Sequence, residues 1–327
     1  MKKYSYLIVL LLIVLVILVF GNHFLKQPNQ NTDRHIFFAM DTFFEIQSNE
    51  IVNWNKVLKQ IQTELALIDD QLNAYHQNSE IAMINQNASK EPVKVSEVTF
   101  NTIKKAIEFG TSSNGLFDIS FQPLQDLYGF EQGQYRVPTP QEIEETKKSV
   151  NFAYIKLNEG KQEVQFLKPG MKLNLSGLIK GIALDRIVKY LQSEGMHEFS
   201  LNFGGNLYIQ SDKEETIGIK NPSGSDIITS ILVKKGFVST SSNGEQYFIQ
   251  NDLRYSHIIN PITGSAASSN DSVTVVSDTG ILSDFLSTYL YLLPVGEISE
   301  YMQDNFPEAG YYVIQKNKIV LSKDQTR

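Results

Sequence analysis

The chain begins with the stretch that most constrains its topology, MKKYSYLIVLLLIVLVILVFG. Lys2 and Lys3 precede an unbroken apolar run over residues 7–20, and with its flanks the segment approaches the length that spans a bilayer. Because lysines favour the inner side of a membrane, the run predicts an N-terminus inside and the rest of the chain outside. A cleaved signal peptide is the alternative, but no small-x-small cleavage site follows the run.

We therefore expect three regions along the chain. Residues 1–21 would form an uncleaved transmembrane signal-anchor, and residues 22–34, which are polar and include Pro28, a short tether. Residues 35–327 would form one large domain. The expected location is the bacterial cell membrane, as a single-pass protein with the large domain on the extracytoplasmic side.

Composition excludes several classes of chemistry. None of the 327 residues is cysteine, so catalytic thiols, thiolate zinc sites and disulfides are ruled out. The formal net charge of −7 makes nucleic acid an unlikely partner, since such partners are bound through excess positive charge. The domain is therefore expected to work with hydroxyl, carboxylate, imidazole and amine groups.

Hydrophobic periodicity predicts the element types of the domain. Apolar residues recur in steps of three and four over residues 51–72, which indicates an amphipathic helix that packs on a core. Further helices are expected over residues 96–113, after Thr139 and from Gly177 to Gly195, and a hairpin over residues 151–167. Strands are expected at residues 35–47, 199–209, 227–233, 236–239, 247–249, 272–276, 311–314 and 319–321. This order favours an α+β fold over regular βαβ alternation.

Glycine-rich loops between the apolar elements hold the candidate functional groups. LNLSGLIKGIALD (residues 173–185) places Gly177 and Lys180 at a strand-to-helix junction. This pattern is equally compatible with an anion-binding site and with a plain structural turn. LNFGGNLYI (residues 201–209) has paired glycines in an apolar strand, which suggests a bulge or a close ligand approach. His257, beside a Pro/Thr/Gly turn, is either a base or a hydrogen-bonded structural histidine.

The segment SDFLSTYLYLL (residues 283–293) raises a separate question, because an apolar helix opens with Asp284 and has Thr288 one turn later. Residues four apart share a helix face, so the carboxylate and the hydroxyl lie side by side. One interpretation is a helix start, where Asp and Thr cap the first turn. The other is a pair of oxygen ligands for a divalent cation.

Taken together and in order, these segments resemble the ApbE family, the FAD:protein FMN transferases or flavin transferases. The matching segments cover nearly the whole domain: MDTFFEI (residues 40–46), NAYHQNSEIAMIN (73–85), GLFDISFQPL (115–124), LNLSGLIKGIALD, LNFGGNL (201–207), STSSNGEQYF (239–248), HIINPITG (257–264) and SDFLSTYLYLL. The resemblance implies an ApbE-type, T-fold-like α+β domain with mixed sheets and packed helices.

The resemblance also implies a reaction and a metal. The hydroxyl of a Thr or Ser in a target flavoprotein attacks the FMN-side phosphorus of FAD, and AMP leaves. Mg²⁺ would be held by Asp284, Thr288 and the carbonyl of Gly177, and His257 would be the general base. Lys180 would steady the phosphates or form a structural ion pair with Asp185. The acceptor would carry a short motif around the modified Thr or Ser.

FAD, the substrate, is expected in a groove that several of the segments build. Tyr75 is a candidate for stacking on the isoalloxazine ring. Further FAD-binding candidates are Met40, Ser79, Asp118, Asn202, Gly204, Gly205 and Thr240. Glu80 and Asn85 would instead hold their loop in shape, and Asp118 would either contact the ligand or cap a turn.

The chain departs from the family pattern at five positions: Asp41, Asn174, Ser176, Asn206 and Asn260. Asn174, Asn206 and Asn260 stand where acidic residues are usual. Because the expected metal ligands and His257 are retained, we expect an active enzyme. The alternatives are a Mg²⁺-dependent FAD pyrophosphatase, in which water replaces the acceptor hydroxyl, and a non-catalytic FAD-binding surface protein.

Overall fold

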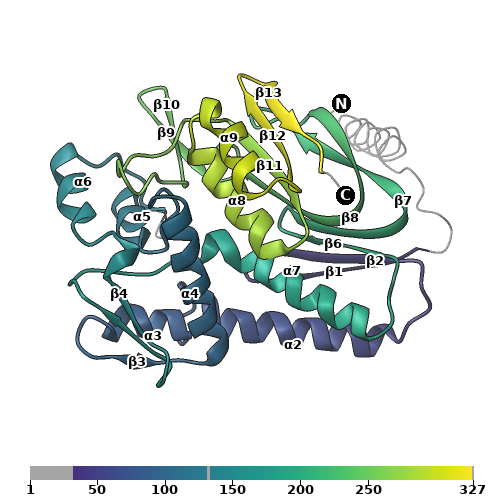
Figure 1. The fold of residues 1–327 in the computed structure, drawn as a ribbon, viewed down its shortest axis with the longest axis horizontal. Coiled ribbons are helices and arrows are strands. Elements are labelled where there is room, and N and C mark those ends of the chain that lie inside the picture. The colour runs from purple at the N-terminus through teal and green to yellow at the C-terminus, as the bar shows by residue number, and fades with distance from the viewer. Residues whose placement is uncertain (1–31, 131–132, 326–327) are drawn as a thin grey trace, which may run out of the picture.

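A large antiparallel sheet forms the centre of the fold (Figure 1). The computed structural model describes residues 32–130 and 133–325, so the expected signal-anchor lies outside the described residues. Within those two ranges, no helix has the length and apolar character needed to cross a bilayer. The sheet has eight strands in the order β1-β2-β6-β7-β8-β11-β12-β13.

The bounds of these strands show that both ends of the domain contribute to one sheet. They are β1 (Asp33–Ala39), β2 (Thr42–Ser48), β6 (Phe199–Phe203), β7 (Asn206–Lys220), β8 (Ile227–Ser242), β11 (Ser272–Ser277), β12 (Gly310–Gln315) and β13 (Lys318–Lys323). Two small sheets lie outside it: β3 (Val93–Lys94), β5 (Glu163–Phe166) and β4 (Ile155–Asn158) in one, and β9 (Tyr247–Gln250) with β10 (Leu253–Ser256) in the other.

Helices α2 (Trp54–Leu72), α7 (Ser176–Ser193) and α8 (Gly280–Leu292) pack on one face of the large sheet, and α9 (Val295–Asn305) follows α8. The other helices lie beyond the end of the sheet in Figure 1: α3 (Glu80–Asn87), α4 (Glu97–Ser112), α5 (Gln122–Tyr128) and α6 (Pro140–Lys147), with a 3₁₀ turn η1 (Phe152–Tyr154). Figure 1 shows α2 and α7 side by side, and α8 against the strands. The main apolar core lies between these helices and the sheet. The α+β class expected from the sequence is confirmed.

Local sequence signals account for several elements. The apolar stripe of α2 is buried at Val57, Ile61, Leu65, Ile68 and Leu72, as its period of three to four predicts. Helix α6 begins with a complete capping box between Thr139 and Glu142. Burial of the stripe stabilises α2 far more than its intrinsic propensity does.

Two expected strand interiors are turns. Residues 35–47 form the hairpin β1–β2, whose turn at Met40 and Asp41 has φ of 48° and 60°. The glycine pair is also a two-residue hairpin turn, between β6 and β7, with φ of 56° at Gly204 and 92° at Gly205, so the expected bulge is wrong. Both turns use the positive φ values that tight hairpins require.

A long ribbon made of β7 and β8 covers the second face of the sheet. The expected strands at residues 227–233 and 236–239 are one continuous strand, β8. Ile219 and Ile231 of the ribbon share a second apolar cluster with Val276 and Ile314 of the sheet. The ribbon tip reaches the end of β8, where a Cβ on Gly244 would lie 2.3 Å from the Pro222 carbonyl oxygen.

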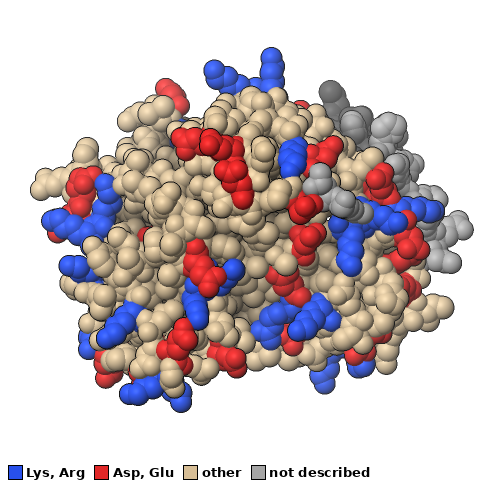
Figure 2. All heavy atoms as spheres, in the orientation of Figure 1, with Lys and Arg blue, Asp and Glu red and all other residues tan. Residues whose placement is uncertain are grey.

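Charged side chains lie mainly on the surface. Figure 2 shows acidic and basic groups interspersed over the face seen in Figure 1. Pairs such as Lys148 with Glu145 and Arg136 with Glu142 are exposed, and exposed pairs contribute little to stability. The fold therefore rests on its apolar clusters, and the charges of interest are those inside a cavity.

Candidate active site

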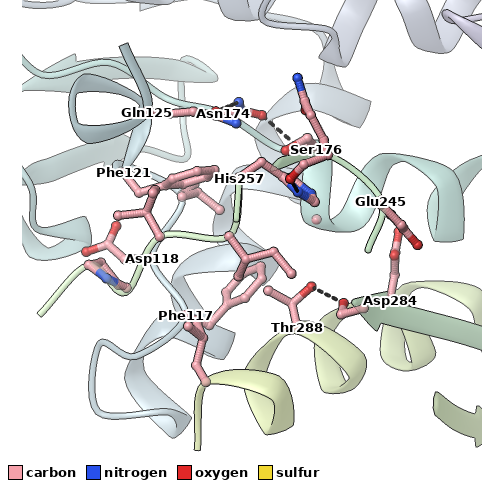
Figure 3. Close-up of a pocket in the computed structure, with 18 of the residues that line it drawn as sticks. Phe117, Asp118, Phe121, Gln125, Asn174, Ser176, Glu245, His257, Asp284 and Thr288 are labelled. Carbon is pink, nitrogen blue, oxygen red and sulfur yellow. Dashed lines mark hydrogen bonds between the residues drawn. The ribbon is translucent and has the colours of Figure 1, made fainter. Parts of the chain in front are cut away.

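A cavity of about 270 Å³ opens where α7, α8 and the end of β8 meet the loops around Asp118 and His257 (Figure 3). Eight of the residues singled out from the sequence line it: Tyr75, Asp118, Gly177, Lys180, Thr240, His257, Asp284 and Thr288. They come from segments that are far apart in the chain. The fold therefore brings most of the expected site together.

Asp284 is buried at one end of this cavity, with 5% of its surface exposed. Helix α8 begins at Gly280 with Thr279 as its N-cap residue, so Asp284 lies in the second turn and the capping interpretation is wrong. The Asp284 Oδ2 atom accepts a hydrogen bond from the Gly181 N–H at 2.9 Å. Burial raises the pKa of the Asp284 carboxyl, while the Lys180 ammonium, the Asn206 side chain and the Gly181 N–H oppose that rise.

A pair of glycines brings α7 and α8 close enough for this contact. A Cβ on Gly181 would lie 2.2 Å from the Gly280 carbonyl oxygen, and a Cβ on Gly280 would lie 2.3 Å from the Gly181 carbonyl oxygen. Neither position accepts a side chain, because backbone atoms occupy the space. Because both contact positions are glycines, the two helices lie close enough for the Asp284 carboxylate on α8 to accept a hydrogen bond from the backbone of α7.

The same contact affects the Gly177 carbonyl. In a regular α-helix the Gly181 N–H bonds the carbonyl four residues earlier, which is that of Gly177. The Gly181 N–H also donates to Asp284, and a carbonyl oxygen has two lone pairs, so the Gly177 carbonyl has capacity for a further partner. The Thr288 hydroxyl oxygen is 3.6 Å from the place that a Gly177 Cβ would occupy. Asp284, Thr288 and Gly177 therefore converge.

These three groups fit a hard divalent cation. A buried carboxylate whose pKa is raised by burial gains from a cation, and all three groups offer oxygen. No group of three or more His, Cys, Asp and Glu side chains that could hold a metal occurs within residues 32–130 and 133–325. The candidate oxygen donors here are one carboxylate, one hydroxyl and one carbonyl.

Hydroxyl pairs between β8 and α8 hold this end of the cavity in place. The Ser239 hydroxyl lies 2.8 Å from that of Ser283. The Ser241 hydroxyl lies 3.0 Å from that of Ser287 and 3.2 Å from that of Thr288. These contacts hold the Thr288 hydroxyl at this end of the cavity, and no sequence motif predicted them.

Lys180 points toward the charged end of the cavity. Its Nζ lies 3.4 Å from the carbonyl oxygen of Gly204. The expected alternative partner, Asp185, instead accepts hydrogen bonds from the Gly280 and Ile281 N–H groups at the start of α8. Asp185 therefore caps a helix, and the Lys180 ammonium remains available to an anion in the cavity.

His257 lies on the cavity wall and is held by one carbonyl. Its Nδ1 is 3.0 Å from the Gln246 carbonyl oxygen, which can only accept. Nδ1 therefore carries the proton, and Nε2 is the basic nitrogen. Burial lowers the pKa of His257, and the Lys180 charge lowers it further against the opposing effect of the Gln246 carbonyl.

Comparison with known proteins agrees with this geometry. The ApbE family model matches residues 40–312. The chain belongs to the ApbE family. The solved structure of the ApbE protein from Thermotoga maritima has a TM-score of 0.81 at 28% identity and covers 90% of this chain and 97% of that one.

Two ApbE relatives carry the name FAD:protein FMN transferase. The protein of Vibrio cholerae is 30% identical over 248 residues, which are 72% of this chain and 74% of the relative. The protein of Escherichia coli K12 is 27% identical over 246 residues, 72% of this chain and 70% of the relative. The resemblance seen in the ordered sequence segments is thereby confirmed.

Some ApbE-type positions hold the site together rather than face the cavity. Ser79 caps α3 and donates to the Asn73 carbonyl. Glu80 accepts from the Ser96 N–H and hydroxyl, and Asn85 bonds both backbone groups of Leu173, as expected for residues that hold their loop. Asp118 lines the cavity, but its carboxylate accepts from Ser120 and from the Phe152 N–H.

Five of the FAD-binding candidates lie outside the cavity lining: Ser79, which caps α3, and Met40, Asn202, Gly204 and Gly205. Met40, Gly204 and Gly205 form the two hairpin turns at one end of the sheet, and Asn202 accepts a hydrogen bond from the Gly205 N–H. The turns are neighbours, because the Gly204 N–H donates to the Phe43 carbonyl. The Gly204 carbonyl contacts the cavity residue Lys180, and Asn206, directly after the turn, interacts with Asp284.

Other cavity residues could not be singled out from the sequence. The Glu245 side chain is solvent-exposed but lies near Lys180 and Asp284, and desolvation by the surrounding protein raises its pKa. Phe117, Phe121, Gln125 and Pro261 add flat or apolar wall. Glu245, Phe117 and Phe121 belong to quoted motif segments, but a motif does not show which of its side chains face a ligand.

Proposed function

We propose that this ApbE protein is an FAD:protein FMN transferase, which moves FMN from FAD to a Thr or Ser hydroxyl of a target flavoprotein and releases AMP. The observation that carries the proposal is the single cavity that joins the basic nitrogen of His257 to Asp284, Thr288 and Lys180. Its aromatic walls suit flat rings, and its charged end suits a pyrophosphate. The names of the curated relatives support the same activity.

In this mechanism His257 accepts the proton of the acceptor hydroxyl. The hydroxyl oxygen forms a bond to the FMN-side phosphorus, and the bond from that phosphorus to the AMP phosphate breaks. The Gln246 carbonyl keeps the imidazole in the tautomer that presents Nε2 as a base. Lys180 offsets negative charge on the phosphates.

Asp284, Thr288 and the Gly177 carbonyl would hold Mg²⁺ at the charged end. When bound, the cation would neutralise charge on the pyrophosphate and orient it. Support for the metal comes from the Asp284 carboxylate, whose burial raises its pKa, and from the closeness of the Thr288 hydroxyl to Gly177.

Release of AMP tests the proposal and separates it from FAD hydrolysis. The protein would be incubated with FAD and Mg²⁺, with and without an acceptor domain that carries the family's Thr or Ser motif. A transferase releases AMP in proportion to the acceptor and leaves FMN on it. Equal AMP release without the acceptor would instead identify a Mg²⁺-dependent pyrophosphatase.

We propose further that the domain works outside the cytoplasm, joined to the membrane by residues 1–21. The support is the apolar run and the lysines that precede it. The acceptor would then be an extracytoplasmic flavoprotein, and FAD would have to be exported.

A further inference from the structure

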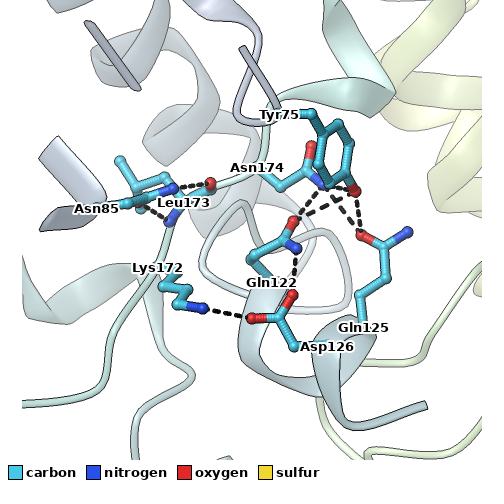
Figure 4. Close-up of polar contacts among 8 residues, drawn as sticks. All are labelled: Tyr75, Asn85, Gln122, Gln125, Asp126, Lys172, Leu173 and Asn174. Carbon is cyan, nitrogen blue, oxygen red and sulfur yellow. Dashed lines mark hydrogen bonds and ion pairs between the residues drawn. The ribbon is translucent and has the colours of Figure 1, made fainter. Parts of the chain in front are cut away.

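A network of neutral polar side chains reaches the cavity through Tyr75, Gln125 and Asn174 (Figure 4). It joins Tyr75, Gln122, Gln125 and Asn174, which come from three separate parts of the chain, because both glutamines lie on α5. The three amide side chains are at least nine-tenths buried. Polar groups buried to that extent require hydrogen-bond partners. The orientation of each amide that lines the cavity therefore decides whether its oxygen or its nitrogen faces the cavity.

One end of the network is fixed by a group that can only donate. The Ser176 N–H donates to Asn174 Oδ1 at 2.7 Å. Asn174 must therefore present its Nδ2 to the other side, where it donates to Gln125 Oε1 at 3.0 Å and to Gln122 Oε1 at 2.5 Å. The side-chain oxygen of each glutamine therefore accepts a hydrogen bond within the network.

The other end is fixed by a group that can only accept. Gln122 Nε2 donates to the Asp126 carboxylate at 2.6 Å, and Lys172 pairs with the second oxygen of that carboxylate at 2.6 Å. The Tyr75 hydroxyl also donates to Gln125 Oε1 at 3.0 Å. Because both ends are fixed, the Gln125 amide cannot be turned over without two donors meeting.

The consequence is one unused donor at the cavity. Gln125 lines the cavity and is 5% exposed, and Figure 4 shows its nitrogen on the side away from the network. No hydrogen-bond partner for this nitrogen occurs among residues 32–130 and 133–325. Phe121 and Pro261 supply apolar wall in the same cavity. A buried donor beside apolar walls suits a flat ring with an acceptor at its edge.

Resting on the proposed function, we propose that Gln125 is a specificity residue whose Nε2 donates a hydrogen bond to an acceptor atom on the edge of one ring system of FAD. Both the isoalloxazine and the adenine carry carbonyl oxygens or ring nitrogens that can accept. The network supplies the orientation of the donor, and the apolar walls supply the plane of the ring.

The substitution Gln125→Glu tests this directly in the purified full-length protein. Glutamate keeps the size of the side chain and the oxygen that accepts from Tyr75 and Asn174, but replaces the outward donor with an acceptor. Binding of FAD, FMN and AMP would be measured by calorimetry with Mg²⁺. We expect FAD affinity to fall about tenfold or more, since a lost bond and an unpaired acceptor both weaken binding.

The two fragments identify the ring. A loss of affinity for FMN with AMP binding within about twofold of the unsubstituted protein assigns the isoalloxazine, and the reverse assigns the adenine. The variant Gln125→Met, which also lacks the donor but adds no charge, should show the same selectivity. Gln250→Glu makes the same chemical change at an exposed position of β9 outside the cavity and should leave all three affinities unchanged.

Two results would overturn the proposal: unchanged affinity for FAD, FMN and AMP in both Gln125 variants, or an equal loss for FMN and AMP, which indicates general distortion. Thermal unfolding of each variant checks that the fold is retained. The two proposals fail separately: the transferase proposal fails if the unsubstituted protein does not transfer FMN to the acceptor, whereas the role of Gln125 is judged on binding of FAD, FMN and AMP alone.

Discussion

Asp284 is a buried carboxylate without an ion-pair partner among residues 32–130 and 133–325. Its hydrogen bond to Gly181 satisfies only part of its capacity. His257 has the complementary arrangement, because one nitrogen is used by a carbonyl and the other stays basic. At the residue scale, the site thus combines an anion that lacks a cation with a base that is kept neutral.

The Asp284→Asn variant should separate the metal from the fold. Because the folded pKa of Asp284 is raised, its ionisation lowers stability as the pH rises above the unfolded value near 3.8. Without Mg²⁺ at pH 8, the variant should therefore melt at or above the temperature of the unsubstituted protein. Mg²⁺ at about 100 times its Kd should stabilise only the unsubstituted protein, by about 2.7 kcal/mol. Calorimetry checks both, and equal Mg²⁺ shifts in the two proteins would remove Asp284 from the metal site.

The pH dependence of acceptor-dependent AMP release should report on His257. Its pKa lies below the ordinary value of 6.5, so the neutral base predominates at pH 7 and is lost only in more acid solution. We expect the rate to rise with pH to a plateau, with a midpoint below 6.5, and His257→Gln to lack this step. A rate that instead fell between pH 6 and pH 8 would mean that the imidazole acts in its protonated form.

The element scale explains why Asp284 and Thr288 are where they are. Helix α8 approaches α7 through Gly181 and Gly280, and hydroxyl pairs attach it to β8. Sequence periodicity predicted α2 and α7, because their apolar faces repeat over many residues. It missed the β1–β2 turn, since Met40 and Asp41 carry no glycine or asparagine that would signal positive φ.

Gly181→Ala should disturb both stability and activity. The added methyl group would lie 2.2 Å from the Gly280 carbonyl oxygen and 2.9 Å from the Asp284 Cβ, so the helices must separate. We expect a loss of about 1–3 kcal/mol in the free energy of unfolding and a lower rate of FMN transfer. Gly296→Ala in α9 is the control, because nothing lies within 4 Å of its added methyl group. Equal melting temperatures for the two variants would contradict the close helix approach.

At the scale of the whole molecule, the order of the motif segments in the sequence identified the family, whereas the three-dimensional structure identified which residues form the site. The eight motif segments predicted which loops matter, and the fold places most of them around one cavity. The Tyr75, Gln122, Gln125 and Asn174 network could not be predicted, because Tyr75 and Asn174 lie about 50 residues from the two glutamines of α5 and no local pattern links the three parts. The hairpin turn at Gly204 and Gly205 was interpreted as a possible ligand contact, because glycine is used both in tight turns and where a ligand approaches the backbone closely.

Membrane attachment is a property of the full chain that fractionation can measure. We expect the full-length protein to sediment with membranes after a high-salt wash and a version that starts at Thr32 to stay in the supernatant, because the apolar run is removed. Sedimentation of the shortened version to the same extent would place the attachment elsewhere.

The most direct test of the transferase is in-gel flavin fluorescence of an acceptor domain after incubation with this protein, FAD and Mg²⁺. The predicted result is a fluorescent acceptor band, heavier by one FMN in mass spectrometry, that is lost with Asp284→Ala and with His257→Ala. An acceptor that stays dark while the unsubstituted protein binds FAD, or labelling that persists in both variants, would contradict the account.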